Sequence, residues 1–304
     1  MKHLLLSILT GIILIACNSN KQTKEKPLIV CTTSIIGNTV SDLVDSNIVV
    51  KSLMGPGVDP HLYKVTQGDL QLLTNADIII YNGLHLEGKM VEILDKIGRQ
   101  KTVLAIADGI DSSQFINTSG FVGGIDPHIW FDVELWVSGT RYLAKELEKH
   151  IPQQASQLQK NCQLLTQKYI DVHHWTINQI KRIPEQRKVL VTAHDAFGYF
   201  SRAYNLPVKP LQGISTVSEY GLKDVLEMVN FLIEKDIPAV FVESSVSDKS
   251  LKAVIEGCSE KGHKVKIGGA LFSDAMGEKG TPKGTYVGMI QHNVSTIVSG
   301  LSND

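Results

Sequence analysis

The sequence lacks several features that would assign it at once to a common functional class. It has no long basic run, and its 30 Lys and Arg are balanced by 31 Asp and Glu, for a formal net charge of −1. A polyphosphate normally needs a cationic surface, so we expect no nucleic-acid partner. The C-x-x-C spacing of thiolate metal sites and redox pairs is absent, as are the H-E-x-x-H and nucleophile-elbow motifs of hydrolases.

Cysteine is also scarce. The chain has Cys17 in its N-terminal segment and three more at Cys31, Cys162 and Cys258. At most one disulfide can form among the last three. We interpret them as small buried residues.

The N-terminal segment is typical of an exported lipoprotein. Its apolar run from Leu4 to Ala16 is too short for a permanent membrane span but fits the core of an export signal. The ending "LIAC" resembles the bacterial lipobox, in which the cysteine, here Cys17, becomes the lipid-carrying N-terminus. The polar stretch after it is typical of a tether. We predict a signal peptide over 1–16, a lipidated tether over 17–26 and an extracytoplasmic, membrane-anchored protein; the alternative is a plain secretory peptide with an incidental cysteine.

The rest of the chain alternates between strand-like and helix-like segments. A length of 304 residues is too great for one ordinary core and suits two. Alternation of this kind predicts βαβ units and parallel sheets, hence an α/β fold. In the first half we predict strands over 28–36, 47–54, 77–83 and 102–107, with helices over 37–45, 66–76 and 90–98. In the second half we predict strands over 188–193, 238–245 and 264–269, with helices over 218–236, 248–262 and 285–298.

Between these halves the pattern changes to one long helix. The segment 152–182 has no Gly and no internal Pro, and its apolar or small residues recur at steps of three and four from Ala155 to Val172. A helix of this length suggests a strut between two lobes. A helix hairpin would need a break that we do not find. We predict an N-terminal α/β lobe over 27–150, a linking backbone helix over 151–184 and a C-terminal α/β lobe over 185–304.

One short loop occurs twice. "GVDPHLY" at 57–63 and "GIDPHIW" at 124–130 share the pattern Gly-X-Asp-Pro-His-X-aromatic. Proline fixes its own φ and restricts the residue before it, so each copy presents its histidine from a stiff loop. Asp-Pro is a common turn starter, but two copies with the same ending favour a function. The carboxylates of Asp59 and Asp126 are candidates to orient an imidazole or to accept a nearby N–H.

Four potential metal ligands follow strands or their loops. In parallel sheets, ligand groups gather at the carboxyl ends of the strands. His61 and His128 belong to the first lobe, where we expect His128 to begin a helix, and His194 and Asp274 belong to the second lobe. They converge only if the two lobes face each other across a cleft. Three imidazoles and a carboxylate suit Zn²⁺, and the carboxylate also tolerates Mn²⁺.

The other polar candidates receive plainer interpretations. Glu243 ends a predicted strand and is a candidate to hydrogen-bond a ligand or, less favourably, to bind metal itself. His85 could line the rim of the cleft, but we interpret it as structural. His173 and His174 are adjacent on the long helix and point in different directions. We expect His263 and His292 at the surface.

Six stretches together resemble a known family. They are "GPGVDPHLY", "DPHIWFD", "VLVTAHDAFGYFSRAYNL", "LQGISTVSE", "PAVFVESSVS" and "GGALFSDAMG". They resemble the TroA-like zinc and manganese solute-binding lipoproteins of bacterial metal ABC importers. The resemblance runs from about Pro27 to the C-terminus. It implies two (β/α) lobes on a rigid backbone helix, and metal bound by His61, His128, His194 and Asp274.

The resemblance leaves the metal open. Manganese-dedicated members often carry Glu at the third ligand position, which here is His194. Zinc-dedicated members often carry a His-rich loop between the first two ligands, and here that segment holds only His85. His194 in place of Glu argues against a manganese-dedicated protein, and the lack of a His-rich loop argues against a zinc-dedicated one. Zn²⁺ and Mn²⁺ therefore both stay candidates for the bound metal.

We therefore predict a monomeric receptor, not an enzyme, that carries a divalent metal to a membrane permease driven by an ATPase. One alternative is a secreted zinc hydrolase with Glu243 as its base. A catalytic zinc needs an open position, which four protein ligands would close. Another alternative is a surface adhesion protein whose metal is only structural.

Overall fold

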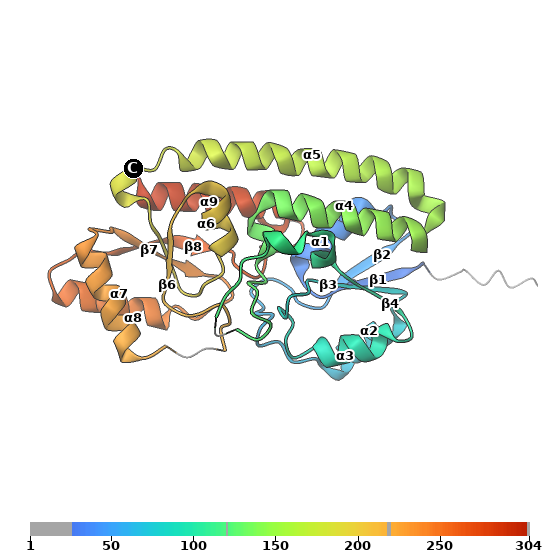
Figure 1. Cartoon of the computed structure of the whole chain (residues 1–304), viewed down its shortest axis with the longest axis horizontal. Helices are drawn as coiled ribbons and strands as arrows, with labels where there is room; N and C mark the ends of the chain where they lie inside the picture. Colours follow the sequence, from blue (N-terminus) through green and yellow to red (C-terminus); the bar gives the residue numbers. More distant parts are fainter. Residues whose placement is uncertain (1–25, 120, 218–219, 303–304) are drawn as a thin grey trace, which may run out of the picture.

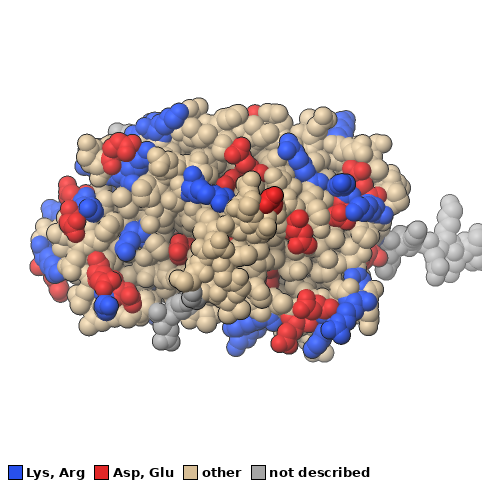
Figure 2. All heavy atoms as spheres, viewed as in Figure 1, with Lys and Arg blue, Asp and Glu red and all other residues tan. Residues whose placement is uncertain are grey.

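A computed structural model describes residues 26–119, 121–217 and 220–302. The predicted signal peptide, Cys17 and all of the tether except Lys26 lie outside these ranges. Within them, no helix is both long and apolar enough to span a bilayer. On the face seen in Figure 2, basic and acidic side chains are interspersed.

The first half of the chain builds a four-stranded parallel sheet in the order β2-β1-β3-β4 (Figure 1). The strand β3 is buried almost throughout, and such strands read as continuous apolar runs because helices cover both faces of the sheet. The elements are β1 (Leu28–Cys31), α1 (Ser34–Leu43), β2 (Val49–Ser52), α2 (Gln67–Asn75), β3 (Ile78–Tyr81), α3 (Val91–Gly98), β4 (Thr102–Ala105) and the short 3₁₀ turns η1 (Ile106–Gly109) and η2 (Ser112–Gln114).

The second half repeats this plan with a parallel sheet in the order β6-β5-β7-β8. In each sheet the strand order reverses beside the central pair, β1/β3 and β5/β7, which is where ligands bind in open parallel sheets. The elements are η5 (Glu185–Arg187), β5 (Leu190–Thr192), α6 (Gly198–Tyr204), β6 (Val208–Pro210), α7 (Leu222–Glu234), β7 (Ala239–Glu243), α8 (Lys249–Glu260), β8 (Lys266–Leu271), η6 (Pro282–Gly284) and α9 (Tyr286–Leu301).

Two predicted element boundaries, at the end of the first strand and at His128, are wrong. The strand predicted over 28–36 ends at Cys31, because the Thr33 side chain caps α1 by accepting from the Ile36 N–H. His128 does not begin an α-helix. It precedes a 3₁₀ turn, η3 (Ile129–Phe131), and the α-helix α4 (Val133–His150) starts only after the Asp132 side chain caps it.

The long helix is present but shorter than predicted. A 3₁₀ turn, η4 (Pro152–Gln154), replaces its first turn, and α5 (Ala155–Ile180) follows with 26 residues, roughly 39 Å. It runs past both sheets and packs against α4, α9 and α1 (Figure 1). The two sheets are therefore joined along one side by long helices.

One apolar core extends through both halves at that side. Its largest cluster includes Ile29 of β1 and Phe241 of β7, both fully buried. Buried aromatic side chains also bond across the halves. The Tyr286 hydroxyl of α9 donates to the Trp130 carbonyl oxygen at 2.8 Å, and its ring stacks on Trp136 of α4. The helix side of the molecule is thus tightly joined.

The cysteines in the described ranges are all free thiols. Cys31 and Cys258 are buried, as expected, and burial raises the pKa of both thiols. Cys162 is only half-buried on α5, so the expectation of burial is wrong there, because it lines a surface hollow with Arg141 and Glu148 of α4.

Candidate metal site

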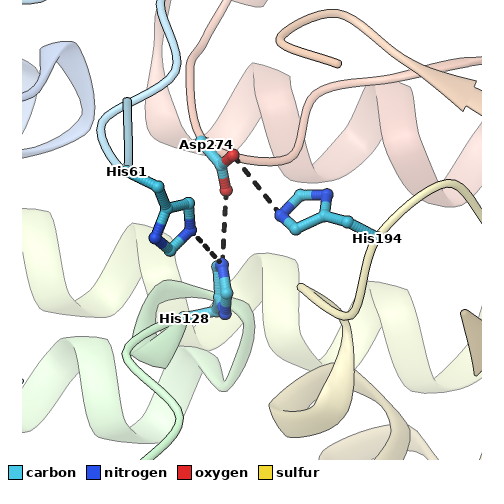
Figure 3. Close-up of side chains that lie close together, drawn as sticks. All are labelled: His61, His128, His194 and Asp274. Atoms are coloured by element: carbon cyan, nitrogen blue, oxygen red, sulfur yellow. Dashed lines mark hydrogen bonds and ion pairs between the residues drawn. The ribbon is translucent and has the colours of Figure 1, made fainter. Parts of the chain in front are cut away.

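Four side chains from both halves of the chain converge on one point. His61, His128, His194 and Asp274 each offer a ligand atom, and these atoms all lie within 4.8 Å of one another (Figure 3). The Nε2 atoms of His61 and His128 are 3.3 Å apart, and Asp274 lies 3.4 Å from the Nε2 atoms of His128 and His194. All four residues are at least 96% buried. The group is the only one of metal-binding type found within the described ranges.

The repeated loop folds the same way in both copies. Each begins on a glycine with positive φ, +69° at Gly57 and +66° at Gly124, where a side chain would be strained. The Oδ1 atoms of Asp59 and Asp126 then accept the N–H of the histidine two residues later, at 2.8 and 2.9 Å. This is an Asx turn, with proline between the carboxylate and the histidine. The shared sequence pattern thus encodes one rigid way to present an imidazole.

The two copies differ in what else the carboxylate does. Asp126 Oδ1 also accepts from Nδ1 of His128 at 2.7 Å, which leaves Nε2 of that ring facing the site. Asp59 does not bond the His61 ring in this way. Its Oδ2 instead accepts from the Thr216 hydroxyl at 2.5 Å, on the opposite half of the chain.

His194 is oriented by a carboxylate from the neighbouring strand. It stands two residues after β5, and Glu243 ends β7. Glu243 Oε1 accepts the His194 backbone N–H at 2.9 Å, and Oε2 accepts from its Nδ1 at 2.5 Å. Both carboxylate oxygens are therefore used to fix the ring, and Nε2 is left to face the site.

Asp274 is supported by residues that sequence reasoning missed. The Trp130 indole N–H donates to the Ser273 carbonyl oxygen at 2.9 Å, and the Ser245 hydroxyl donates to Asp274 Oδ2 at 3.3 Å. Trp130 is the aromatic residue that ends the second repeated motif. That position was the one available signal for its role.

Burial and charge act differently on the two first-half histidines. Burial, only partly opposed by Asp274, lowers the pKa of His61 to about 3. Burial also acts against a charge on His128, but the Asp126 and Asp274 carboxylates outweigh it and raise the pKa of His128 to about 9. His61 is therefore neutral near pH 7, whereas His128 is a positively charged imidazolium when no cation competes for its nitrogen.

His194 and Asp274, the two second-half residues of the group, each stabilise the charged form of the other. Burial acts against a charge on His194, but the Glu243 and Asp274 carboxylates outweigh it and raise the pKa of His194 well above its ordinary value. In turn His194 and His128 overcome burial and hold the pKa of Asp274 well below its ordinary value. The carboxylate is thus ionised throughout the physiological range.

The donor set fits a transition-metal cation. His194 Nε2 and Asp274 Oδ1 are buried and have no hydrogen-bond partner among the described residues. Unpartnered buried polar atoms are costly unless a ligand satisfies them. Imidazole nitrogens with one carboxylate oxygen form a set that Zn²⁺ accepts, and the His128 and His194 rings are each held by a carboxylate on Nδ1.

The other histidines within the described ranges lie outside this group. His85 is exposed, has a positive φ of 61° and contacts the loop at Gly123. His173 faces the Tyr204 hydroxyl at 3.2 Å, and His174 is exposed. His263 and His292 are half-buried rather than exposed, because each ring lies against a backbone carbonyl.

Comparison with known proteins identifies the family of the chain. The family described as ZnuA, zinc-uptake complex component A, periplasmic, matches residues 29–300. The chain belongs to this family.

Individual relatives cover nearly the whole chain. The manganese-binding lipoprotein MntA of Bacillus subtilis is 48% identical over 284 residues, which are 93% of this chain and 92% of the relative. The zinc-binding protein TroA of Treponema pallidum is 42% identical over 299 residues, 98% of this chain and 96% of the relative. The solved structure of periplasmic zinc-binding TroA from Treponema pallidum superposes with a TM-score of 0.88 at 44% identity, covering 91% of this chain and all of that one. The predicted α/β fold and the family resemblance are therefore confirmed for this ZnuA-family chain.

Proposed function

We propose that this protein is the extracytoplasmic receptor of a metal ABC importer, which binds Zn²⁺ or Mn²⁺ as cargo and delivers it to the membrane permease. One observation carries the proposal: four buried donor atoms from separate loops of both halves face one point. The names of the relatives support it, since MntA is named for manganese and TroA for zinc. The function is capture and release.

The proposed ligands are His61, His128, His194 and Asp274. Their support is the mutual distances of their donor atoms and the unpartnered atoms of His194 and Asp274. We propose two lobes, 27–150 and 185–304, joined by the linking segment 151–184. The cargo would then lie between the lobes.

The arrangement favours transport over hydrolysis. A zinc hydrolase needs an open coordination position and a free base. Glu243, which would have to act as that base, has both oxygens engaged on His194. Four protein donors also leave the cation enclosed.

Zn²⁺ and Mn²⁺ are both candidates for the transported ion. Nitrogen-rich sets bind Zn²⁺ more tightly than Mn²⁺ by intrinsic affinity. The relative with 48% identity is nevertheless named for manganese. Availability and the permease would then decide which ion is carried.

The predicted anchor also stays a proposal. Lipid on Cys17 would hold a monomeric receptor beside its permease, on the outer side of the membrane. Membrane fractionation of a Cys17→Ala variant tests it, and retention in the membrane fraction would reject lipid attachment.

Direct titration tests the proposed function. Chelated, metal-free protein should bind one equivalent of Zn²⁺ or Mn²⁺ in calorimetry, and His128→Ala should lose most of that affinity while staying folded. The exposed His174→Ala is the matched control and should bind like the parent chain. Parent protein that binds neither ion would reject the proposal.

A further inference from the structure

A single carboxylate connects the first ligand loop to the opposite half of the molecule. Asp59 lies on the loop after β2, and Thr216 lies between β6 and α7. The Thr216 hydroxyl donates to Asp59 Oδ2 at 2.5 Å, and Asp59 Oδ1 accepts the His61 N–H at 2.8 Å. The position of His61 is therefore tied through Asp59 to a residue 157 positions away in the sequence.

This use of Asp59 distinguishes it from the carboxylates behind the other two imidazoles. Asp126 and Glu243 each bond the ring nitrogen of their histidine directly. The second carboxylate oxygen of Asp59 instead accepts a hydrogen bond from Thr216. His61 is thus the one histidine of the three whose carboxylate partner bridges the two halves.

The bridge also differs from the bonds on the helix side. There the bond from Trp130 to Ser273 and the bond from Tyr286 to Trp130 are fully buried. Thr216 and Asp59 are only half-buried, and the neighbouring Val217 is 56% exposed. Water can compete for the Asp59–Thr216 bond, so it can open while the buried side stays closed.

We propose that Thr216 is a positioning residue that sets how fast the bound cation leaves, because it holds Asp59 and through it His61. The inference rests on the proposed function, since it needs a bound cation. Opening of the Asp59–Thr216 bond frees the His61 loop and removes one ligand. The other three ligands are held by buried contacts and keep their places.

Removal of the hydroxyl should act mainly on release. Thr216→Val keeps the branched shape but cannot donate to Asp59. A hydrogen bond to a charged group contributes enough to change a rate constant by roughly tenfold. We expect the dissociation rate of Zn²⁺ to rise by about tenfold, with the association rate nearly unchanged. Thr216→Ser, which keeps the hydroxyl, should restore slow release.

Stopped-flow release into excess chelator measures this rate. Thr74→Val is the matched control, because the Thr74 hydroxyl bonds only its own helix at the Leu70 carbonyl oxygen. It should release Zn²⁺ at the parent rate. Thermal melts of all variants should agree within a few degrees, since Thr216 is on a half-buried loop.

A double-mutant comparison tests the route through Asp59. In an Asp59→Asn background, Thr216→Val should add much less acceleration than it does alone. Equal release rates for Thr216→Val and the parent, equally fast release for Thr216→Ser, or full additivity with Asp59→Asn would each overturn the proposal. Parent protein that binds no cation would instead remove the proposed function, so the two failures are distinguishable.

Discussion

Trp130 and Ser273 connect two of the four candidate ligands across the molecule. The indole N–H of Trp130, two residues after His128, donates to the carbonyl oxygen of Ser273, the residue before Asp274. The distance is 2.9 Å and the indole is 1% exposed. The separation between a first-half ligand and a second-half ligand is therefore set by a buried hydrogen bond.

We expect Trp130→Phe to weaken metal binding and lower stability together. The substitution keeps a ring in the core but leaves the Ser273 carbonyl oxygen buried without its donor, at a cost of about 1–3 kcal/mol. Calorimetric titration and a thermal melt measure the two effects. Trp175, which is half-buried on α5, provides the control: Trp175→Phe should change metal affinity and melting temperature less than Trp130→Phe does. Unchanged affinity in Trp130→Phe would show that this bond does not position Asp274.

Glu243→Gln tests whether the carboxylate sets the protonated nitrogen of His194. A glutamine amide can still accept the backbone N–H, but its NH₂ would donate to Nδ1 and place the ring proton on Nε2, which faces the site. We expect a 10- to 100-fold loss of metal affinity with little change in the melt, as for other residues that orient metal-binding imidazoles. Glu234→Gln, at the exposed end of α7, should bind like the parent chain. A parent-like affinity for Glu243→Gln would contradict this role.

The sequence predicted the main architecture because its strongest signals are local. The run at 78–81 is apolar throughout, so β3 could be predicted, whereas β6 is three residues long with a proline and was missed. The long helix was predicted from its stripe of spacing three and four. Its first turn is 3₁₀ instead, with Pro152 at the start.

In the candidate site, too, the residues in local sequence patterns could be predicted and the long-range contacts could not. The repeated Asp-Pro-His pattern indicated His61 and His128 because each loop encodes its own turn. The bond from Thr216 to Asp59 and that from Trp130 to Ser273 join residues 157 and 143 positions apart. Such contacts depend on how the two halves pack, and no local pattern in one sequence carries that information. The ligand role of the four residues stays a prediction.

Metal affinity should rise with pH up to about pH 9. The pKa of His128 is raised to about 9 and that of His194 is raised well above its ordinary value, so protons compete with a cation for both rings. A cation must displace these protons, while His61, with its pKa lowered to about 3, gives up none. The loss of about one to two protons predicts a fall in affinity of about 10- to 100-fold per pH unit below pH 9.

Calorimetry in buffers of different ionisation enthalpy counts the released protons directly. The observed heat of binding at pH 7 should depend linearly on the buffer's ionisation enthalpy, with a slope of about one to two protons. Titration of a protein in which His128 is replaced by Ala should give a smaller slope. A heat that is the same in every buffer would contradict the raised pKa of His128.

Removal of the metal should leave the protein folded. The largest apolar core joins both sheets to the long helices and does not depend on a cation. Asp274 lies 3.4 Å from His128 and from His194, and positive charge on these rings offsets its buried charge without a cation. A cation at 100 times its Kd adds only about 2.7 kcal/mol. For a chain of this size we expect chelation to lower the Tm by roughly 5 to 10 °C while the melt stays cooperative. Loss of the far-ultraviolet dichroism on adding chelator at 25 °C would instead favour a structural metal, and the receptor proposal would then lose to that alternative.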